Sequence, residues 1–285
     1  MTIHEKTDHF PGIDCGNGAP ILFVHGAACD HRIWKPHIQN LSQRYRCIAP
    51  TLRWFGPHQW PATSLEFNEQ THANDLASII ENLECGPVFV VGWSYGANVA
   101  LRLSVGRPDL ICGVAVYEPS STSLVRTPLG IATHQLSMQE TFLPVTETAA
   151  TGDAVEVLKA FISAVGGPDT LGKLPPNLRQ ICLENAHTLI PLLSAKHRFA
   201  SVAAAELETL PMPVHLAWGQ KSGDAWTIPS KAAASLTNVR GCMIPGADHI
   251  WPAKNPAAFL SWLDSVLRQS SIDELTLQSR RTAAM

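Results

Sequence analysis

The chain has no hydrophobic run longer than a β-strand and no block of like charges. A helix that crosses a bilayer needs about 20 consecutive apolar residues, so we expect no membrane span. The 21 basic and 24 acidic residues nearly balance, for a net charge of −3. Without a basic patch, neither nucleic acid nor a membrane surface is an expected partner.

The sequence also has no C-x-x-C motif and no cluster of residues spaced as metal ligands. The seven cysteines are scattered, odd in number and never spaced as C-x-x-C, which favours reduced thiols in a cytoplasmic protein. The polar residues 1–9 do not resemble a secretory signal peptide. No group of His, Asp or Glu has the spacing of metal ligands, so we expect neither a metal nor a cofactor.

Short apolar runs alternate with segments of helical periodicity along most of the chain. The alternation predicts an α/β fold with a mostly parallel, twisted sheet flanked by helices, and 45% hydrophobic residues can supply its core. Expected strands are 21–24, 46–49, 87–91, 113–117, 214–218 and 239–244. The helical patterns are centred on residues 33–41, 76–83, 97–103 and 256–266.

A long segment between two of these strands has no strand-like run. Residues 120–210 are predicted to form short helices, interrupted by prolines such as Pro128, Pro144 and Pro191. Inserted after the strand that ends near Tyr117, they are expected to form a helical cap over the strand ends. The predicted organisation is therefore a core (1–119 and 211–269), a cap (120–210) and a polar C-terminal tail (270–285).

The pattern G-x-S-x-G occurs at residues 92–96, between an expected strand and an expected helix. In this context it is typical of a strained turn that exposes a nucleophilic serine at the end of a sheet. Gly92 and Gly96 are needed because strand and helix approach closely there. Ser94 is therefore the candidate nucleophile.

A serine hydroxyl needs a base within hydrogen-bonding reach. His249 follows the last expected strand and precedes the last helix, so it is the candidate base. An oxyanion also needs donors. The backbone N–H of Tyr95, at the start of a helix, and that of Ala27, in the His-Gly-Ala loop after the first apolar strand, are the candidate pair.

These three segments, His-Gly at 25–26, G-W-S-Y-G at 92–96 and G-A-D-H at 246–249, closely resemble the α/β-hydrolase superfamily over roughly residues 18–268. The resemblance implies an eight-stranded sheet with a helical cap. It also implies the order nucleophile, acid, histidine along the chain.

The acid of the triad is where the sequence departs from that family. The usual position, three residues beyond Gly219, is occupied by Ser222. Two carboxylates are alternatives: Glu118, directly after an expected strand, and Asp224, in a loop. We favour Glu118, because a carboxylate at a strand end is better fixed than one beside Gly223.

For the substrate pocket we predict contributions from Trp251, Tyr95 and Trp34. The apolar composition of the expected cap favours a small, uncharged substrate. We expect a serine hydrolase that cleaves an ester, lactone or related acyl bond. The alternatives are a carbon–carbon bond hydrolase and a cofactor-independent dioxygenase of the same fold. A homodimer is compatible with the sequence.

Overall fold

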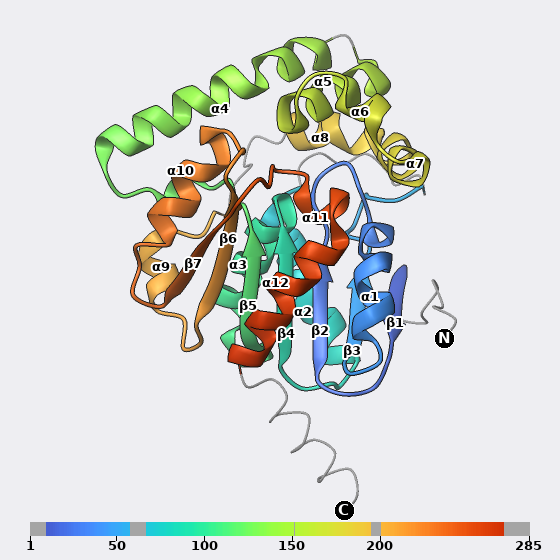
Figure 1. Cartoon of the computed structure of the whole chain (residues 1–285), viewed down its shortest axis with the longest axis vertical. Helices are drawn as coiled ribbons and strands as arrows, with labels where there is room; N and C mark the ends of the chain where they lie inside the picture. Colours follow the sequence, from blue (N-terminus) through green and yellow to red (C-terminus); the bar gives the residue numbers. More distant parts are fainter. Residues whose placement is uncertain (1–9, 58–66, 151, 195–200, 271–285) are drawn as a thin grey trace, which may run out of the picture.

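The computed structural model describes residues 10–57, 67–150, 152–194 and 201–270, and the predicted tail lies outside them except for its first residue. One seven-stranded sheet forms the centre of this part (Figure 1), one strand fewer than the resemblance implies. Its order is β1-β3-β2-β4-β5-β6-β7. Only β1 is antiparallel to its neighbour, which confirms the predicted mostly parallel sheet. The strands are β1 (Gly12–Cys15), β2 (Pro20–Val24), β3 (Arg46–Pro50), β4 (Val88–Trp93), β5 (Ile111–Tyr117), β6 (Val214–Gly219) and β7 (Val239–Ile244).

Helices cover both faces of the sheet (Figure 1). Strand residues alternate between the two faces: Ile21 and Phe23 belong to the core shared with α1 (Lys35–Leu41) and α12 (Pro256–Gln269). Their neighbours Leu22 and Val24 belong to the core shared with α2 (Glu69–Asn82) and α3 (Tyr95–Gly106). Burial on both faces explains why these strands are continuous apolar runs.

Between β5 and β6 the chain forms a series of helices. Figure 1 shows α4 to α8 lying beyond the C-terminal ends of the strands, and we call these the inserted helices. The division into core and cap at residues 120 and 210 stays a prediction. The helices between β5 and β6 are α4 (Pro128–Ala149), α5 (Ala154–Gly166), α6 (Thr170–Lys173), α7 (Pro176–Glu184), α8 (Leu189–Ser194) and α9 (Ala204–Glu208).

The remaining helical elements connect the strands. Helix α10 (Asp224–Ala233) follows β6 and contains Pro229. No helix of the described residues combines the length and apolar character needed to cross a membrane. The short elements are α11 (Trp251–Lys254) and the 3₁₀ turns η1 (His31–Trp34), η3 (Pro108–Leu110), η4 (Thr122–Leu124) and η5 (Ala186–Thr188).

The register of the central strands brings their C-terminal ends level. Val24 lies opposite Gly92, and Trp93 lies opposite Tyr117. Tyr117 in turn lies opposite Ala217. The residues that directly follow β2, β4 and β5 therefore meet at one edge of the sheet, beneath the inserted helices.

Candidate active site

Ser94 follows β4 in a backbone conformation that L-residues rarely adopt, with φ 56° and ψ −121°. The glycines of the motif are required by close contact. A Cβ on Gly96 would lie 2.3 Å from the carbonyl oxygens of Val24 and His25, and one on Gly92 would lie 2.5 Å from the Gly96 oxygen. Any side chain at either position would push α3 away from the sheet and displace the serine.

Hydrogen bonds hold this strained turn in place. The Ser94 N–H donates to the Tyr117 carbonyl at 2.9 Å, and the Ser94 carbonyl accepts from the N–H groups of Ala97 and Asn98. The Tyr95 N–H is the first of helix α3, so it has no acceptor within the helix. It therefore remains available beside the serine hydroxyl.

His249 lies in the loop between β7 and α11, and contacts from three other elements fix it. The Trp93 indole N–H donates to the His249 carbonyl at 2.9 Å, and the Tyr117 hydroxyl donates to the Asp248 carbonyl at 2.7 Å. The imidazole stacks on Trp226 of α10, with 4.2 Å between ring centroids and an interplanar angle of 26°. The ring therefore has little freedom to rotate.

Ser94, His249 and Glu118 form a continuous hydrogen-bonded chain. The Ser94 Oγ lies 2.9 Å from His249 Nε2, and His249 Nδ1 lies 2.5 Å from Glu118 Oε2. Because a carboxylate only accepts, Nδ1 carries the proton and Nε2 is left to accept from the serine hydroxyl. The imidazole is thus in the tautomer that a general base requires.

Glu118 is completely buried and held from both ends. Its backbone N–H donates to the Ala217 carbonyl at 3.1 Å, and its Oε1 accepts from the Gly219 N–H at 2.6 Å. The residue also has a positive φ, 52°, which turns the chain away from the end of β5. These constraints direct Oε2 at His249.

The alternative acid, Asp224, lies elsewhere. It is exposed at the first turn of α10, where its Oδ1 accepts from the Thr227 hydroxyl at 3.3 Å. The structure therefore brings Glu118, and not Asp224, to the histidine. The reason is that α10 begins at Asp224, so this carboxylate belongs to the first helical turn instead of the expected loop.

The loop after β2 places Ala27 beside Ser94. Leu52 N–H donates to His25 Nε2 at 3.0 Å, so His25 Nδ1 carries the proton and donates to the Gly26 carbonyl at 2.8 Å. Burial lowers the pKa of His25 to about 4, so the ring is neutral near pH 7. In a trans peptide the C=O and the next N–H point in opposite directions. Anchoring the Gly26 oxygen therefore turns the Ala27 N–H away from His25.

Two cavities meet at Ser94, and both are bordered by Ala27 and His249. The first cavity, about 100 Å³, extends toward α4 and α8. The second, about 40 Å³, extends toward α7 and η1. Among the described residues, no Asp, Glu, Lys or Arg side chain borders the first cavity, and His249 is its only histidine. Its apolar lining is Met138, Phe142, Phe161, Val165, Leu192, Leu193 and Trp226.

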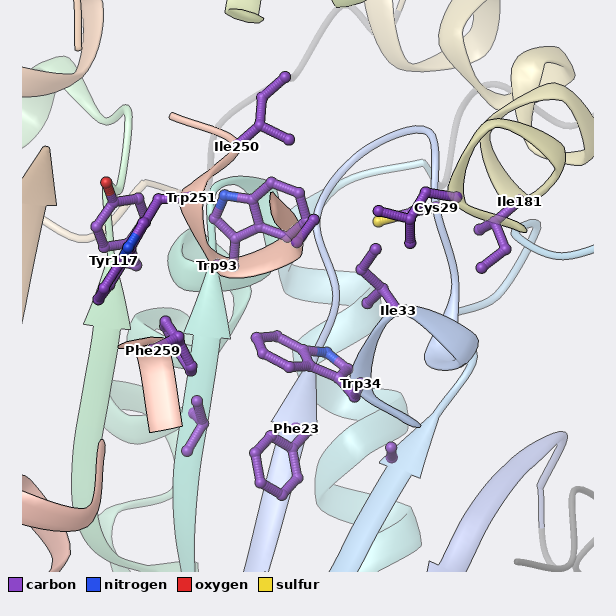
Figure 2. Packing of buried hydrophobic residues seen from close by; sticks show 14 of the residues in the cluster. Phe23, Cys29, Ile33, Trp34, Trp93, Tyr117, Ile181, Ile250, Trp251 and Phe259 are labelled. Carbon is purple, nitrogen blue, oxygen red and sulfur yellow. The ribbon is translucent and has the colours of Figure 1, made fainter. Parts of the chain in front are cut away.

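Two of the three residues predicted to bind substrate lie in the hydrophobic core. Trp34 is completely buried between Phe23 and Phe259 (Figure 2). Trp251 packs against Tyr117 and Phe259 in the core. Trp34 ends η1 and Trp251 begins α11. Both side chains point at the sheet, because these two elements cover its face.

The third, Tyr95, borders the first cavity, but its ring belongs to an aromatic cluster with Phe55, Phe67 and His72. Its hydroxyl donates to His72 Nδ1 at 2.7 Å. Three other aromatic residues that line the first cavity were not predicted: Phe142, Phe161 and Trp226. Two belong to the inserted helices, and sequence spacing does not show which face of such a helix points at the sheet.

A buried polar network ties the inserted helices to the sheet. The Asn185 amide donates to Asp30 Oδ2 at 2.7 Å and accepts from the Gly56 N–H at 2.6 Å. Burial opposes ionisation of Asp30, but hydrogen bonds from Arg32 and Asn185 outweigh it and lower its pKa to about 2. Arg32 also pairs with Glu184 of α7. The wall of the second cavity is therefore anchored to the loop that carries Ala27.

Comparison with known proteins gives the same architecture. The 2-(acetamidomethylene)succinate hydrolase of Mesorhizobium japonicum is 32% identical over 103 residues, 36% of each chain. Matches to the first curated relatives span only 36–37% of those relatives' length. A thermophilic esterase from Thermogutta terrifontis superposes with a TM-score of 0.67 at 21% identity, covering 90% of this chain and 92% of its own.

Est816, described as an N-acyl homoserine lactone degrading enzyme, superposes with a TM-score of 0.65 at 17% identity, covering 88% of this chain and 94% of its own. At these identities the structural likeness concerns the fold. The sequence model of the alpha/beta hydrolase family matches residues 21–262, most of the chain and all three segments that meet at Ser94. The chain belongs to the α/β-hydrolase family.

Proposed function

We propose that this protein is a serine hydrolase that cleaves an ester, lactone or related acyl bond of a small, uncharged, largely apolar substrate. The supporting observation is the chain of hydrogen bonds from Ser94 through His249 to Glu118, at the junction of two apolar cavities. The M. japonicum relative is by its name a hydrolase, which agrees with hydrolysis as the reaction. The inserted helices would act as the cap that closes the site.

In this mechanism His249 Nε2 takes the proton of Ser94 as the Oγ attacks the substrate carbonyl. The backbone N–H groups of Tyr95 and Ala27 stabilise the oxyanion that develops. Glu118 stabilises the imidazolium, which then protonates the leaving group. Water, activated by the same histidine, releases the acyl group from the serine.

The cavities support an uncharged substrate. A charged group in a cavity lined by Met138, Phe142 and Phe161 would lose its hydration without gaining a partner. The two cavities extend from Ser94 in different directions, so one can hold the acyl arm and the other the alcohol arm. A lactone would occupy both with one ring and its substituent.

Labelling with a fluorophosphonate probe tests this proposal. Intact mass spectrometry should show one adduct on the wild-type chain and none on Ser94→Ala, because only the activated serine is nucleophilic. The wild-type protein should hydrolyse p-nitrophenyl butyrate, and Ser94→Ala should lose that activity. Substrate-dependent oxygen uptake that survives Ser94→Ala would instead favour the dioxygenase alternative and overturn the hydrolase.

A further inference from the structure

A third cavity, about 400 Å³, adjoins the first and shares with it Ser120, Met138 and Phe142. It lies between α4 and the segment that leads from Glu118 into η4. The three shared residues place the two cavities next to each other. A substrate arm that leaves Ser94 through the first cavity would therefore pass Ser120.

The hydroxyl of Ser120 is oriented by Asn98. The Ser120 N–H donates to Asn98 Oδ1 at 3.1 Å, which identifies that atom as the amide oxygen. The Asn98 Nδ2 then donates to Ser120 Oγ at 3.2 Å. The serine oxygen is thus an acceptor, and within the described part of the chain its own hydrogen has no acceptor. A hydrogen-bond donor is left at the junction of the two cavities.

The next residue, Ser121, has a side-chain oxygen without a hydrogen-bond partner among the described residues. Its side chain is 4% exposed and borders the third cavity, yet its Oγ has no hydrogen-bond partner among the described residues. The residue precedes η4, where a serine commonly caps the first turn, but here the side chain makes no capping bond. A buried hydroxyl without a partner is destabilising, so a ligand that supplies one would be favoured.

The third cavity is lined by uncharged polar side chains together with the apolar Met138, Phe142 and Leu143. Beside the two serines, Gln135, Gln139 and Thr146 contribute amides and a hydroxyl, and no charged side chain lines it among the described residues. Such a lining suits oxygen atoms that accept or share hydrogen bonds. It gives no counter-ion to a carboxylate or an ammonium group.

From these contacts we propose that Ser120 and Ser121 form a subsite for an uncharged substrate arm that carries oxygen acceptors. The arm runs from Ser94 along the apolar first cavity and places an ether, carbonyl or hydroxyl oxygen at the two serines. The substrate class is thus an oxygenated ester or lactone instead of a plain alkyl ester. This inference rests on the proposed hydrolase and makes the two serines specificity-determining residues.

Matched esters test the subsite. Wild-type, Ser120→Ala and Ser121→Ala are compared on p-nitrophenyl octanoate and on analogues in which one chain CH₂, at successive positions, is replaced by an ether oxygen. Octyl butyrate and its ether analogues are used as well, with hydrolysis measured by the release of acid. They cover the case in which the alcohol arm of the substrate occupies the third cavity. For each variant the readout is the kcat/KM ratio of oxygenated to all-carbon ester.

In at least one series and ether position, the ratio should fall about threefold to tenfold in each variant, the value of one neutral hydrogen bond. Ser78→Ala, the same change on the exposed face of α2, should leave the ratio unchanged. Rates on the all-carbon ester report that each variant is folded. Ratios unaffected by both serine variants at all positions in both series would overturn the subsite while leaving the hydrolase intact. Wild-type inactivity on all esters, with no Ser94 labelling, would overturn both.

Discussion

At the scale of single residues, the site is built on two strained positions. Ser94 and Glu118 both have positive φ, at 56° and 52°, and both directly follow a central parallel strand. Such conformations persist only where surrounding contacts enforce them. Here the Ser94 N–H bonds to the Tyr117 carbonyl, and the Glu118 N–H bonds to that of Ala217. The same inter-strand ladder therefore holds nucleophile and acid.

The first prediction concerns which carboxylate acts. Glu118→Gln should lower kcat on p-nitrophenyl butyrate by on the order of 10⁴-fold, because the amide cannot stabilise the imidazolium and favours the wrong tautomer. Asp224→Asn is the matched control and should keep near-normal kcat, because its carboxylate is exposed at the start of α10. Near-normal turnover by Glu118→Gln together with inactive Asp224→Asn would reverse the assignment.

At the scale of elements, the approach of α3 to β2 and β4 decides the geometry around Ser94. The helix lies so close that Gly96 has two backbone oxygens within 2.3 Å of where a Cβ would be. The glycines were predictable from G-x-S-x-G, because the pattern itself implies that approach. The cavity wall was not, because Phe142, Phe161 and Trp226 come from three helices whose packing sequence spacing does not determine.

The second prediction tests that approach. Gly96→Ala should destabilise the fold by about 1–3 kcal/mol through overpacking and should lower kcat/KM by roughly 10²-fold or more, because Ser94 is displaced. The control is Gly106→Ala, at the end of the same helix, where nothing lies within 4 Å of the added Cβ. It should stabilise the helix by about 0.4–1 kcal/mol and keep full activity. Urea denaturation measures the stability of each variant, and ester hydrolysis measures its activity. Equal stability and activity of the two variants would contradict the close approach of α3 at Gly96.

At the scale of the whole molecule, buried neutral histidines join segments that are distant in the chain. His25 bonds to Leu52, His37 to the Pro252 carbonyl, and His72 to Tyr95 and the Arg53 carbonyl. Burial lowers the pKa of His25 and His37 to about 4 and that of His72 to about 3. Burial has the opposite effect on the Glu69 carboxyl and raises its pKa to about 8.

The third prediction follows from these opposite shifts. Below pH 6.5 the unfolded chain binds more protons at the histidines, so the free energy of unfolding should fall as pH drops toward 4, by on the order of 1 kcal/mol per pH unit for each group. Between pH 6.5 and 8 the folded chain holds the extra proton, on Glu69, so stability should fall as pH rises. Urea denaturation across this range should therefore show a maximum near pH 6.5.

Glu69→Gln separates the two limbs. The variant should flatten the decline between pH 6.5 and 8 and retain the loss of stability below pH 6.5, because the three histidines are unchanged. If the upper limb keeps its slope in the variant, then Glu69 does not hold a proton in the folded chain.

The sequence by itself determined the mostly parallel α/β fold and the family, and it predicted Ser94, His249 and Ala27 at a common edge. Those features depend on local patterns: buried strands, tight turns that need glycine, and residues that directly follow strands. The tertiary structure decided that Glu118 and not Asp224 reaches His249, that Trp34 and Trp251 lie in the core, and which inserted helices line the cavities. Strand register and helix packing set these distances, because they bring together residues far apart in the chain and leave no periodic signal within it.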